Sequence, residues 1–411
     1  MGIVLNRGQQ IACDAAIDWF YNSSSSLFQV AAEAGCGKSV LVGEIVKRLN
    51  LKSYEILPMA YTGQAAMVMR THGLPNACTC HSGLFVPYQA PLLDDNGKPV
   101  IDYRFNTPVM IWKFEPKDFR GTEIKLIILD EAWMIPKRFK KFIDDTGIKV
   151  IATGDPGQLP PVRDEPGYLI DGTIYYLDEL MRQDANSGLV YLARRIRRGG
   201  SLEYGQYGNV LVIGDAELTN NMISAANLVL CGTNNTRGII NNKVRNEILG
   251  YSSDYPHYGE RIICRQNNWS KELEDGLPLV NGMAGTVINP PSLSSMDNKT
   301  KTFKIDFAPD VNINSPFFGL DVNYQFLNSK DQNEKDKIRR SRYTRGELFE
   351  YAYASTVHLA QGSEYSRGIY IEEWMGRREQ AALNYTAITR FKDQLIIVKH
   401  TPKFWSFQNW M

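Results

Sequence analysis

The residues best suited to chemistry form a run of small side chains that ends in Gly37, Lys38 and Ser39. This run, AEAGCGKS at residues 32–39, follows the apolar stretch LFQVA and precedes an amphipathic stretch at residues 40–49. A strand, a small-residue loop and a helix in this order predict a cradle whose backbone N–H groups point at phosphate. Lys38 adds positive charge there, and the Ser39 hydroxyl suits Mg²⁺. The segment predicts a nucleoside triphosphate site lined by Ala34, Gly35, Cys36, Gly37, Lys38 and Ser39.

Two residues of this loop need comment. Ala32 stands where the pattern usually has its first Gly, and Ala serves there if its backbone φ is negative. Cys36 lies between two glycines, so a bulky maleimide adduct is expected to block the cradle, with bound ATP protecting the thiol. The alternative for the whole segment is a chance Gly-Lys-Ser at a helix cap.

Two more polar groups follow buried-type strands. Asp130 and Glu131 come directly after the run LIIL, which predicts a metal-binding carboxylate and a second one that polarises the attacking water. Gln158 lies in the loop GDPGQLPP at residues 154–161, where it is suited to orient water and sense the γ-phosphate. Taken alone, the first pair could cap a helix and the second loop could be a rigid turn.

The composition indicates an ordinary globular protein. The chain has 411 residues, 43% of them hydrophobic and 22% charged, and a net charge of +1, so any nucleic-acid site must be a local groove. The six cysteines contain no C-x-x-C pair, which favours reduced thiols and no metal cluster. The chain has no apolar run of 18 residues and no signal pattern at residues 1–20, so we expect an intracellular, cytoplasmic protein without a membrane span.

The elements that position these residues read as alternating strands and helices. Apolar runs are expected to form strands at residues 54–60, 125–129, 150–153, 227–231, 261–264, 368–371 and 394–398, with helices such as 236–249 and 378–390 between them. This pattern predicts an α/β fold with parallel sheets and function at the carboxyl ends of the strands. The runs fall into two clusters, 1–184 and 185–411, which predict two similar lobes.

Each lobe is expected to carry an insert. Residues 85–120 contain Asp95-Asn96-Gly97, a hairpin signal, here expected to join residues 90–94 to residues 98–104. Residues 266–350 contain strand-like stretches at 285–288, 302–307, 322–327 and 346–353, which predict a small β-barrel. The charge-dense stretch 330–345 within it is either a solvated helix or loop, which is the simpler interpretation, or a nucleic-acid contact.

Together the motifs resemble superfamily 1 helicases. The residues that carry the resemblance, in family order, are the three segments above with Leu5–Gln9 (Q-motif), Ala60–Ala66 (motif Ia, with Tyr61 in place of Pro), Thr79–His81 (Ib), Leu180–Gln183 (IV), Thr356–Glu364 (V) and Tyr385–Arg390 (VI). The resemblance implies two RecA-like P-loop lobes: 1–84 with 121–184, and 185–265 with 351–411. It also implies a hairpin insert at 85–120 and a small SH3-like barrel insert at 266–350.

The resemblance also implies roles for individual residues. The catalytic set is Lys38, Glu131, Gln158, Arg182 and Arg390, with Arg390 reaching across from the second lobe to the γ-phosphate. Gln9 would read adenine, Glu364 would contact the nucleotide, and Ser39 with Asp130 would hold Mg²⁺ beside ATP. The alternative for Arg390 is a surface arginine at a helix end.

The implied DNA-binding side chains are mostly small hydrogen-bond donors suited to phosphates. They are Thr62, Gly63, Thr79, His81, Asn234, Thr356 and His358. Asn234 could instead cap the helix that contains Thr236, and His358 could be structural. The arginines at positions 194, 195, 197 and 198 are interpreted as a solvated helix rather than a DNA contact.

The pattern HLAQGSE at residues 358–364 is similar to the RecD-like 1B branch, including compact phage helicases of the Dda type. This branch implies 5′→3′ movement on single-stranded DNA, unwinding at single-strand/duplex junctions, a monomer, and contacts with single-strand-binding or replication proteins in a bacterial host. Two alternatives remain: an ATPase that remodels protein–DNA complexes or acts as a subunit, and an RNA helicase of the same superfamily.

Overall fold

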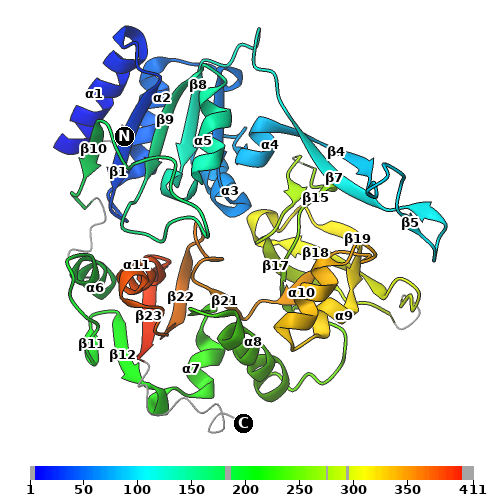
Figure 1. Cartoon of the computed structure of the whole chain (residues 1–411). Helices are drawn as coiled ribbons and strands as arrows, with labels where there is room; N and C mark the ends of the chain where they lie inside the picture. Colours follow the sequence, from blue (N-terminus) through cyan, green and yellow to red (C-terminus); the bar gives the residue numbers. More distant parts are fainter. Residues whose placement is uncertain (1–4, 181–186, 275, 293–295, 400–411) are drawn as a thin grey trace. The chain divides into compact units, whose positions relative to one another are not determined.

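The computed structural model describes residues 5–180, 187–274, 276–292 and 296–399. The chain divides into two compact units (Figure 1). Unit 1 contains residues 1–79, 120–251 and 353–411, and unit 2 contains residues 80–119 and 252–352. Among the described residues, no helix combines the length and apolarity needed to cross a membrane.

The first sheet of unit 1 has six parallel strands in the order β10-β1-β9-β8-β2-β3. The strands are β1 (Leu27–Ala32), β2 (Ile56–Ala60), β3 (Cys78–Thr79), β8 (Leu126–Asp130), β9 (Lys149–Gly154) and β10 (Ile174–Leu177). The accompanying helices are α1 (Arg7–Asn22), α2 (Lys38–Leu49), α3 (Gly63–Thr71) and α5 (Lys137–Asp144). Side chains of α1, α2 and α3 share one hydrophobic core with the strands, which explains why the strand sequences are almost continuously apolar.

The second sheet of unit 1 has the order β11-β12-β23-β22-β13-β21, parallel except for the β11–β12 pair. Its strands are β11 (Gly205–Tyr207), β12 (Val210–Gly214), β13 (Leu228–Cys231), β21 (Ala354–Thr356), β22 (Tyr365–Glu372) and β23 (Phe391–Lys399). Alternate strand residues enter two separate cores. One contains α6 (Gly188–Arg197) and α11 (Arg377–Ile388); the other contains α7 (Asn220–Ala225) and α8 (Asn234–Asn242), which continues as a π-helix to Ile248.

These two sheets confirm the predicted α/β fold with parallel sheets. The apolar runs at 54–60, 125–129, 150–153, 227–231, 368–371 and 394–398 all fall on strands of unit 1. They form strands because each run is flanked by helices that bury it.

Unit 2 contains a five-stranded antiparallel sheet in the order β19-β18-β17-β14-β20. Its strands are β14 (Arg261–Cys264), β17 (Ala284–Asn289), β18 (Thr302–Pro309), β19 (Phe317–Asn323) and β20 (Phe349–Tyr351), and β15 (Asn268–Glu272) pairs with β16 (Pro278–Leu279). Two helices, α9 (Tyr324–Asn328) and α10 (Gln332–Arg340), lie between β19 and β20 in the chain. The SH3-like character of this insert stays a prediction.

One expected strand in this insert is wrong. Residues 322–327 do not continue as a strand, because β19 ends at Asn323 and α9 begins at the next residue. The Asn323 side chain accepts a hydrogen bond from the backbone N–H of Phe326 at 2.9 Å, which caps the helix. The apolar residues Phe326 and Leu327 are buried from the helix instead.

The hairpin of unit 2 also differs from its prediction. The turn at residues 94–97 is present, with Gly97 at φ 75°, and it joins the predicted segments near the turn: the Asp94 N–H donates to the Lys98 carbonyl and the Val100 N–H donates to the Leu92 carbonyl, both at 2.8 Å. Farther from the turn the prediction fails, because β4 (Phe85–Pro91) pairs with β7 (Met110–Pro116). Residues 101–108 form a small second hairpin, β5 (Ile101–Asp102) with β6 (Thr107–Pro108). The insert therefore branches at its far end.

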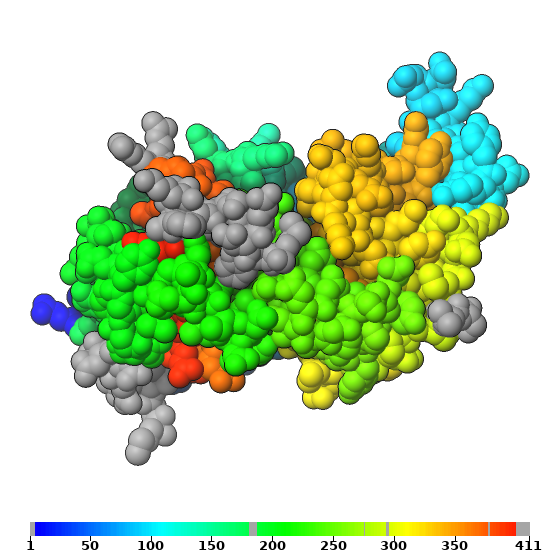
Figure 2. Space-filling model, turned by 90° about the horizontal axis from the view of Figure 1, so that it is seen from below, coloured from blue at the N-terminus to red at the C-terminus, as the bar shows by residue number. Residues whose placement is uncertain are grey.

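The hairpin and the second insert are joined by a buried carboxylate. Asp102 is 1% exposed and receives two hydrogen bonds from the Arg104 guanidinium, both 3.0 Å, and one from Arg345 at 2.7 Å. Trp269 of β15 packs edge-on against Trp112 of β7, with ring centroids 5.5 Å apart. In the space-filling view, the cyan hairpin lies against orange residues of the insert (Figure 2). Both predicted inserts lie within unit 2.

The environment of Asp102 leads to the prediction that acid weakens the junction between the hairpin and the second insert. Hydrogen bonds from Arg104 lower the pKa of Asp102 to about 2 from its ordinary 3.8. Because the folded pKa is depressed, the stabilisation is complete above about pH 4 and is lost as pH falls toward 2. Urea unfolding of the wild type and Asp102→Asn should therefore differ at pH 6 and converge near pH 2. A difference that does not change with pH would contradict this assignment.

Candidate functional site

The predicted phosphate loop has the required backbone. It joins β1 to α2, with Gly35 at φ 83° and Gly37 at φ 76°, both left-handed conformations that favour glycine. Ala32 is the last residue of β1, and it is not among the described residues that have a positive φ. Ala in place of the usual first Gly therefore causes no backbone strain. The segment therefore forms the strand–loop–helix cradle predicted from its sequence.

Lys38 lies at the start of α2, opposite the predicted water-polarising carboxylate. Its ammonium is 3.5 Å from Glu131 Oε2. Burial alone would lower the pKa of Lys38, but the charges of Glu131 and Asp130 outweigh burial and raise that pKa. Lys38 is therefore a fixed positive charge at the cradle.

Glu131 is held in a left-handed conformation, with φ 48°. This conformation is uncommon for a residue with a Cβ, and such strain often occurs at functional sites. It directs the carboxylate back toward Lys38 after β8 ends at Asp130.

Asp130 and Ser39 provide oxygen ligands that fit Mg²⁺. Both border one small cavity beside α2, and Thr153 Oγ1 donates to Asp130 Oδ1 at 3.0 Å, which orients the carboxylate. Among the described residues no cluster of three or more acidic, His or Cys side chains could hold a metal by itself. A cation that keeps waters and shares phosphate oxygens needs only one or two such protein ligands.

The loop that contains Gln158 is held by the second lobe. Leu159 N–H donates to Thr386 Oγ1, and Gln361 Nε2 donates to the Leu159 carbonyl, both at 2.9 Å. Arg390 is 4% exposed and donates from Nη2 to Gln158 Oε1 at 3.2 Å. Two residues predicted to act on the γ-phosphate from different lobes are thus in direct contact within unit 1.

A buried acid next to this loop forms a second link. Asp155 is 0% exposed; it forms an ion pair with Arg197 of α6 and accepts a hydrogen bond from the Tyr385 hydroxyl at 2.6 Å. The Tyr385 oxygen in turn accepts from the backbone N–H of Ala34 at 3.2 Å. Burial and the Asp155 charge raise the pKa of Tyr385, so the hydroxyl stays protonated. A phosphate-loop donor is therefore connected to the second lobe.

The solvated-helix interpretation of the arginines is wrong for two of them. Arg194 and Arg197 reach Glu33 of the phosphate loop, with N–O distances of 3.2 and 3.4 Å. The helical period places both on the α6 face that lies against the loop. Their charges are used within the protein.

The Q-motif glutamine contacts the loop itself. Gln9 is fully buried, and its Nε2 lies 3.2 Å from the Cys36 carbonyl and 3.3 Å from the Gly37 carbonyl. Asn6 and Gln9 also form a reciprocal capping box at the start of α1. Recognition of adenine by Gln9 stays a prediction, whereas its support of the loop is direct.

The Cys36 thiol is less available than its position in the sequence indicated. Its side chain is 0% exposed, and burial, followed by the nearby Glu33 charge, raises the pKa to about 11. The reactive thiolate is therefore scarce at neutral pH, which argues against rapid inactivation by maleimide.

The DNA-binding candidates of unit 1 lie at or just after the carboxyl ends of strands in the two sheets. Thr62 and Gly63 follow β2, which pairs with β3 so that Ala60 lies opposite Thr79. Thr356 lies opposite Cys231, the last residue of the strand that leads to Asn234. The carboxyl ends of these parallel strands carry the candidates on both lobes.

Several of these candidates have local structural partners. Thr62 caps α3 through the N–H of Ala65, and a Cβ on Gly362 would lie 3.0 Å from Thr62 Oγ1, so motifs Ia and V meet closely. Thr233, rather than Asn234, caps α8, and Asn234 is exposed in its first turn. Burial lowers the pKa of His358, which keeps the ring neutral at pH 7.

The remaining predicted residues are His81, Glu364 and Arg182. His81 belongs to unit 2, where its ring is 6.4 Å from that of Phe85. Glu364 is exposed and forms an ion pair with Lys392. Arg182 lies outside the described residues.

Sequence reasoning missed Glu373, which follows β22. Its Oε2 accepts hydrogen bonds from the N–H groups of Gly232 and Thr233 at 2.6 and 2.9 Å, and its Oε1 accepts from the hydroxyls of Thr233 and Thr236 at 3.0 and 2.5 Å. An acid after a strand was the available signal, but its target lies 140 residues earlier in the chain.

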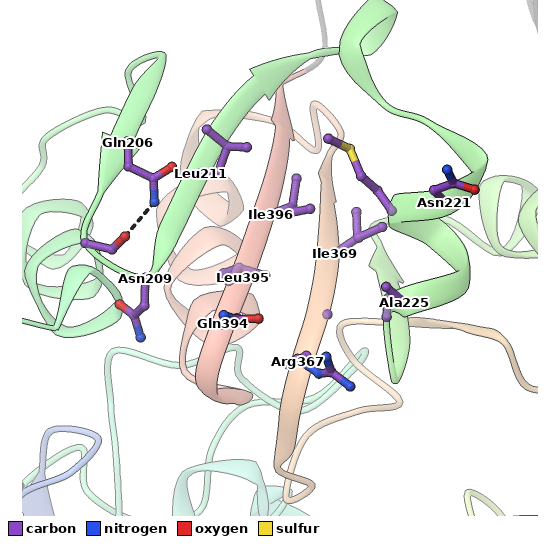
Figure 3. Close-up of a pocket in the computed structure, with 14 residues that line it drawn as sticks. Gln206, Asn209, Leu211, Asn221, Ala225, Arg367, Ile369, Gln394, Leu395 and Ile396 are labelled. Atoms are coloured by element: carbon purple, nitrogen blue, oxygen red, sulfur yellow. Dashed lines mark hydrogen bonds between the residues drawn. The ribbon is translucent and has the colours of Figure 1, made fainter.

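A groove of about 460 Å³ lies away from these motifs, on the second sheet. Figure 3 shows Leu211, Ile369 and Ile396 on the strands, with Asn221 and Ala225 of α7 along one side. It contains none of the predicted nucleotide or DNA residues, so it is not part of the candidate site.

Comparison with protein families and curated proteins covers part of the chain. Residues 15–164 match the model of a family described as AAA domain. An uncharacterized protein of Acanthamoeba polyphaga mimivirus is 26% identical over 197 residues, a match that covers 44% of this chain and 40% of that protein. The chain thus spans about two fifths of the length of this relative.

Solved structures match nearly the whole chain. Pif1 helicase from Candida albicans is 17% identical, with a TM-score of 0.56 over 97% of this chain and 95% of that one. Pif1 from Bacteroides, solved with ADP-AlF3 and single-stranded DNA, is 16% identical, with a TM-score of 0.55 over 97% and 93%. These likenesses confirm the RecA-like α/β fold that the motif resemblance implied.

The link between Tyr385 and Ala34 predicts a change in nucleotide binding. Tyr385→Phe removes the acceptor that occupies the Ala34 N–H, so ATP should bind more tightly, by roughly fivefold for one hydrogen bond of about 1 kcal/mol. Equilibrium titration with a fluorescent ATP analogue measures this change. Tyr370→Phe is the matched control, since its buried hydroxyl donates to Asn384 at 2.7 Å. Equal affinities in both variants would contradict the link.

Proposed function

We propose that this chain, which has the fold of the Pif1 helicases from Candida albicans and Bacteroides, is an ATP-dependent DNA helicase of superfamily 1B. It moves 5′→3′ on single-stranded DNA and unwinds duplexes. The observation that carries the proposal is the contact between Arg390 of one lobe and Gln158 of the other. An arginine in this position can act on a phosphoryl group only when both lobes are together, which couples hydrolysis to lobe movement.

The ATP reaction is assigned to residues of unit 1. The backbone N–H groups of the loop and the Lys38 ammonium bind the β- and γ-phosphates. Ser39 and Asp130 would hold Mg²⁺, which supplies charge neutralisation at the phosphates. Glu131 polarises the attacking water, Gln158 orients it, and Arg390 stabilises charge that develops on the γ-phosphoryl group.

The strand-edge residues of the two sheets provide two separate phosphate contacts on DNA. Thr62 and Thr79 belong to one edge, and Asn234 and Thr356 to the other. Small hydroxyl and amide donors suit a sugar–phosphate backbone without base specificity. Alternate release of these edges during the ATP cycle moves the protein along a strand. The Bacteroides relatives solved with single-stranded DNA support DNA as the partner.

The hairpin of unit 2 is assigned to strand separation. Its β4–β7 pair exposes Val86, Tyr88 and Phe114, a set of apolar side chains suited to contact unstacked bases. Asp102 and Trp112 fix it to the second insert, so it can resist a load.

Strand displacement tests the proposal directly. The wild type with ATP should release the labelled strand from duplex DNA with a 5′ tail, and much more slowly from duplex DNA with a 3′ tail. Lys38→Ala, the matched inactive control, should lose ATP turnover by roughly 10²-fold or more, because its charge at the transferred phosphoryl is gone.

Three outcomes would contradict parts of the proposal. Faster release from 3′ tails would reverse the direction of movement. Preference for RNA duplexes would favour the RNA helicase. DNA-stimulated hydrolysis without displacement of either substrate would favour a translocase that remodels bound proteins.

A further inference from the structure

Four basic side chains gather around two aromatic rings where the hairpin meets the second insert. The Phe105 ring lies 5.6 Å from the Arg104 guanidinium, 4.3 Å from the Lys299 ammonium and 5.5 Å from the Arg345 guanidinium. On the neighbouring Tyr343 ring, Arg104 lies at 5.9 Å and Arg342 at 5.6 Å. We call these six residues the cation–aromatic cluster: Arg104, Phe105, Lys299, Arg342, Tyr343 and Arg345.

This cluster has more positive than negative charge. Its carboxylate partner is Asp102, which accepts from both Arg104 and Arg345. Asp297 lies near Lys299, but its carboxylate accepts from the backbone N–H groups of Lys299 and Thr300. Crowding like charges costs free energy, and the aromatic faces offset only part of that cost. An anionic partner would offset the remainder.

The cluster is fixed in place and accessible. The Arg104 and Arg345 side chains are 38% and 31% exposed, although Asp102 holds them. Arg342 is exposed, and so is Tyr103, at 86%, next to Arg104 at the tip of the small hairpin. The last turn of α10 adds Lys337, Arg339 and Arg340, all exposed and close in sequence to Arg342. Preorganised guanidinium groups on a surface match phosphate oxygens.

We propose that the cation–aromatic cluster binds the phosphate backbone of duplex DNA. The inference rests on the proposed function, since a hairpin that separates strands must meet a duplex. Duplex DNA is favoured over a single strand because phosphates on two strands present a dense charge to several fixed cations. The cluster thus holds the duplex beside the separating hairpin, and the simpler solvated interpretation of residues 330–345 is replaced for Arg342 and Arg345.

Binding without nucleotide tests the cluster separately from hydrolysis. The double variant Lys299→Gln with Arg342→Gln removes two cations that do not hold Asp102. Its affinity for a blunt DNA duplex is measured between 50 and 200 mM salt (about the range over which such contacts are resolved). The slope of log K against log salt should fall by roughly 1.8, since each lost phosphate contact removes about 0.9.

A matched control is Lys304→Gln, an exposed lysine of β18 in the same unit, 63% exposed and 4.0 Å from Asp321. It should leave the slope unchanged. Thermal unfolding verifies that the double variant is folded. An unchanged slope in a folded double variant overturns the proposal, and an equal loss on single-stranded DNA assigns the cluster to that strand and also overturns it. If the double variant shows the reduced salt slope on duplex DNA but the wild type displaces no strand, the helicase proposal is rejected and the proposal for the cluster stands.

Discussion

The candidate site depends on the contacts that a buried carboxylate, Asp155 on the loop after β9, makes with the second lobe. Asp155 is fully buried, and a charge in that position costs several kcal/mol unless it is paired and hydrogen-bonded. Its side-chain partners, Arg197 and Tyr385, come from helices of the second lobe. The loop that carries Gln158 therefore reaches its observed conformation only when the second lobe supplies these groups.

A buried carboxylate paired with arginine also joins the two inserts of unit 2. Asp102 of the hairpin is buried against Arg345 of the second insert, and truncating Asp102 would leave Arg104 and Arg345 without the carboxylate that they share. Ion pairs of this kind add little net stability, but they specify one arrangement of two surfaces. In both units a single acid couples segments that are distant in the sequence: the Gln158 loop to the second lobe in unit 1, and the hairpin to the second insert in unit 2.

Local chemistry made the fold and the nucleotide motifs predictable from the sequence. The phosphate loop, Asp130 and Glu131 each follow an apolar strand, and strand, loop and helix are neighbours in the chain. The failures come from contacts over long separations. Tyr385 meets Asp155 across 230 residues, and Arg197 meets it across 42, so neither contact leaves a local pattern. Similarly, the Asn-Gly turn was predicted correctly, but no local pattern indicated that β4 pairs with β7.

The contact between Arg390 and Gln158 gives the most direct test of the account, because it joins one proposed catalytic residue of each lobe. The measurement is a double-mutant cycle on the DNA-stimulated kcat, using Arg390→Ala, Gln158→Ala and the combined variant. The account predicts that the combined variant is no slower than about the slower single variant, since either change breaks the same unit. A combined loss equal to the product of the two single losses would show independent action and contradict the account.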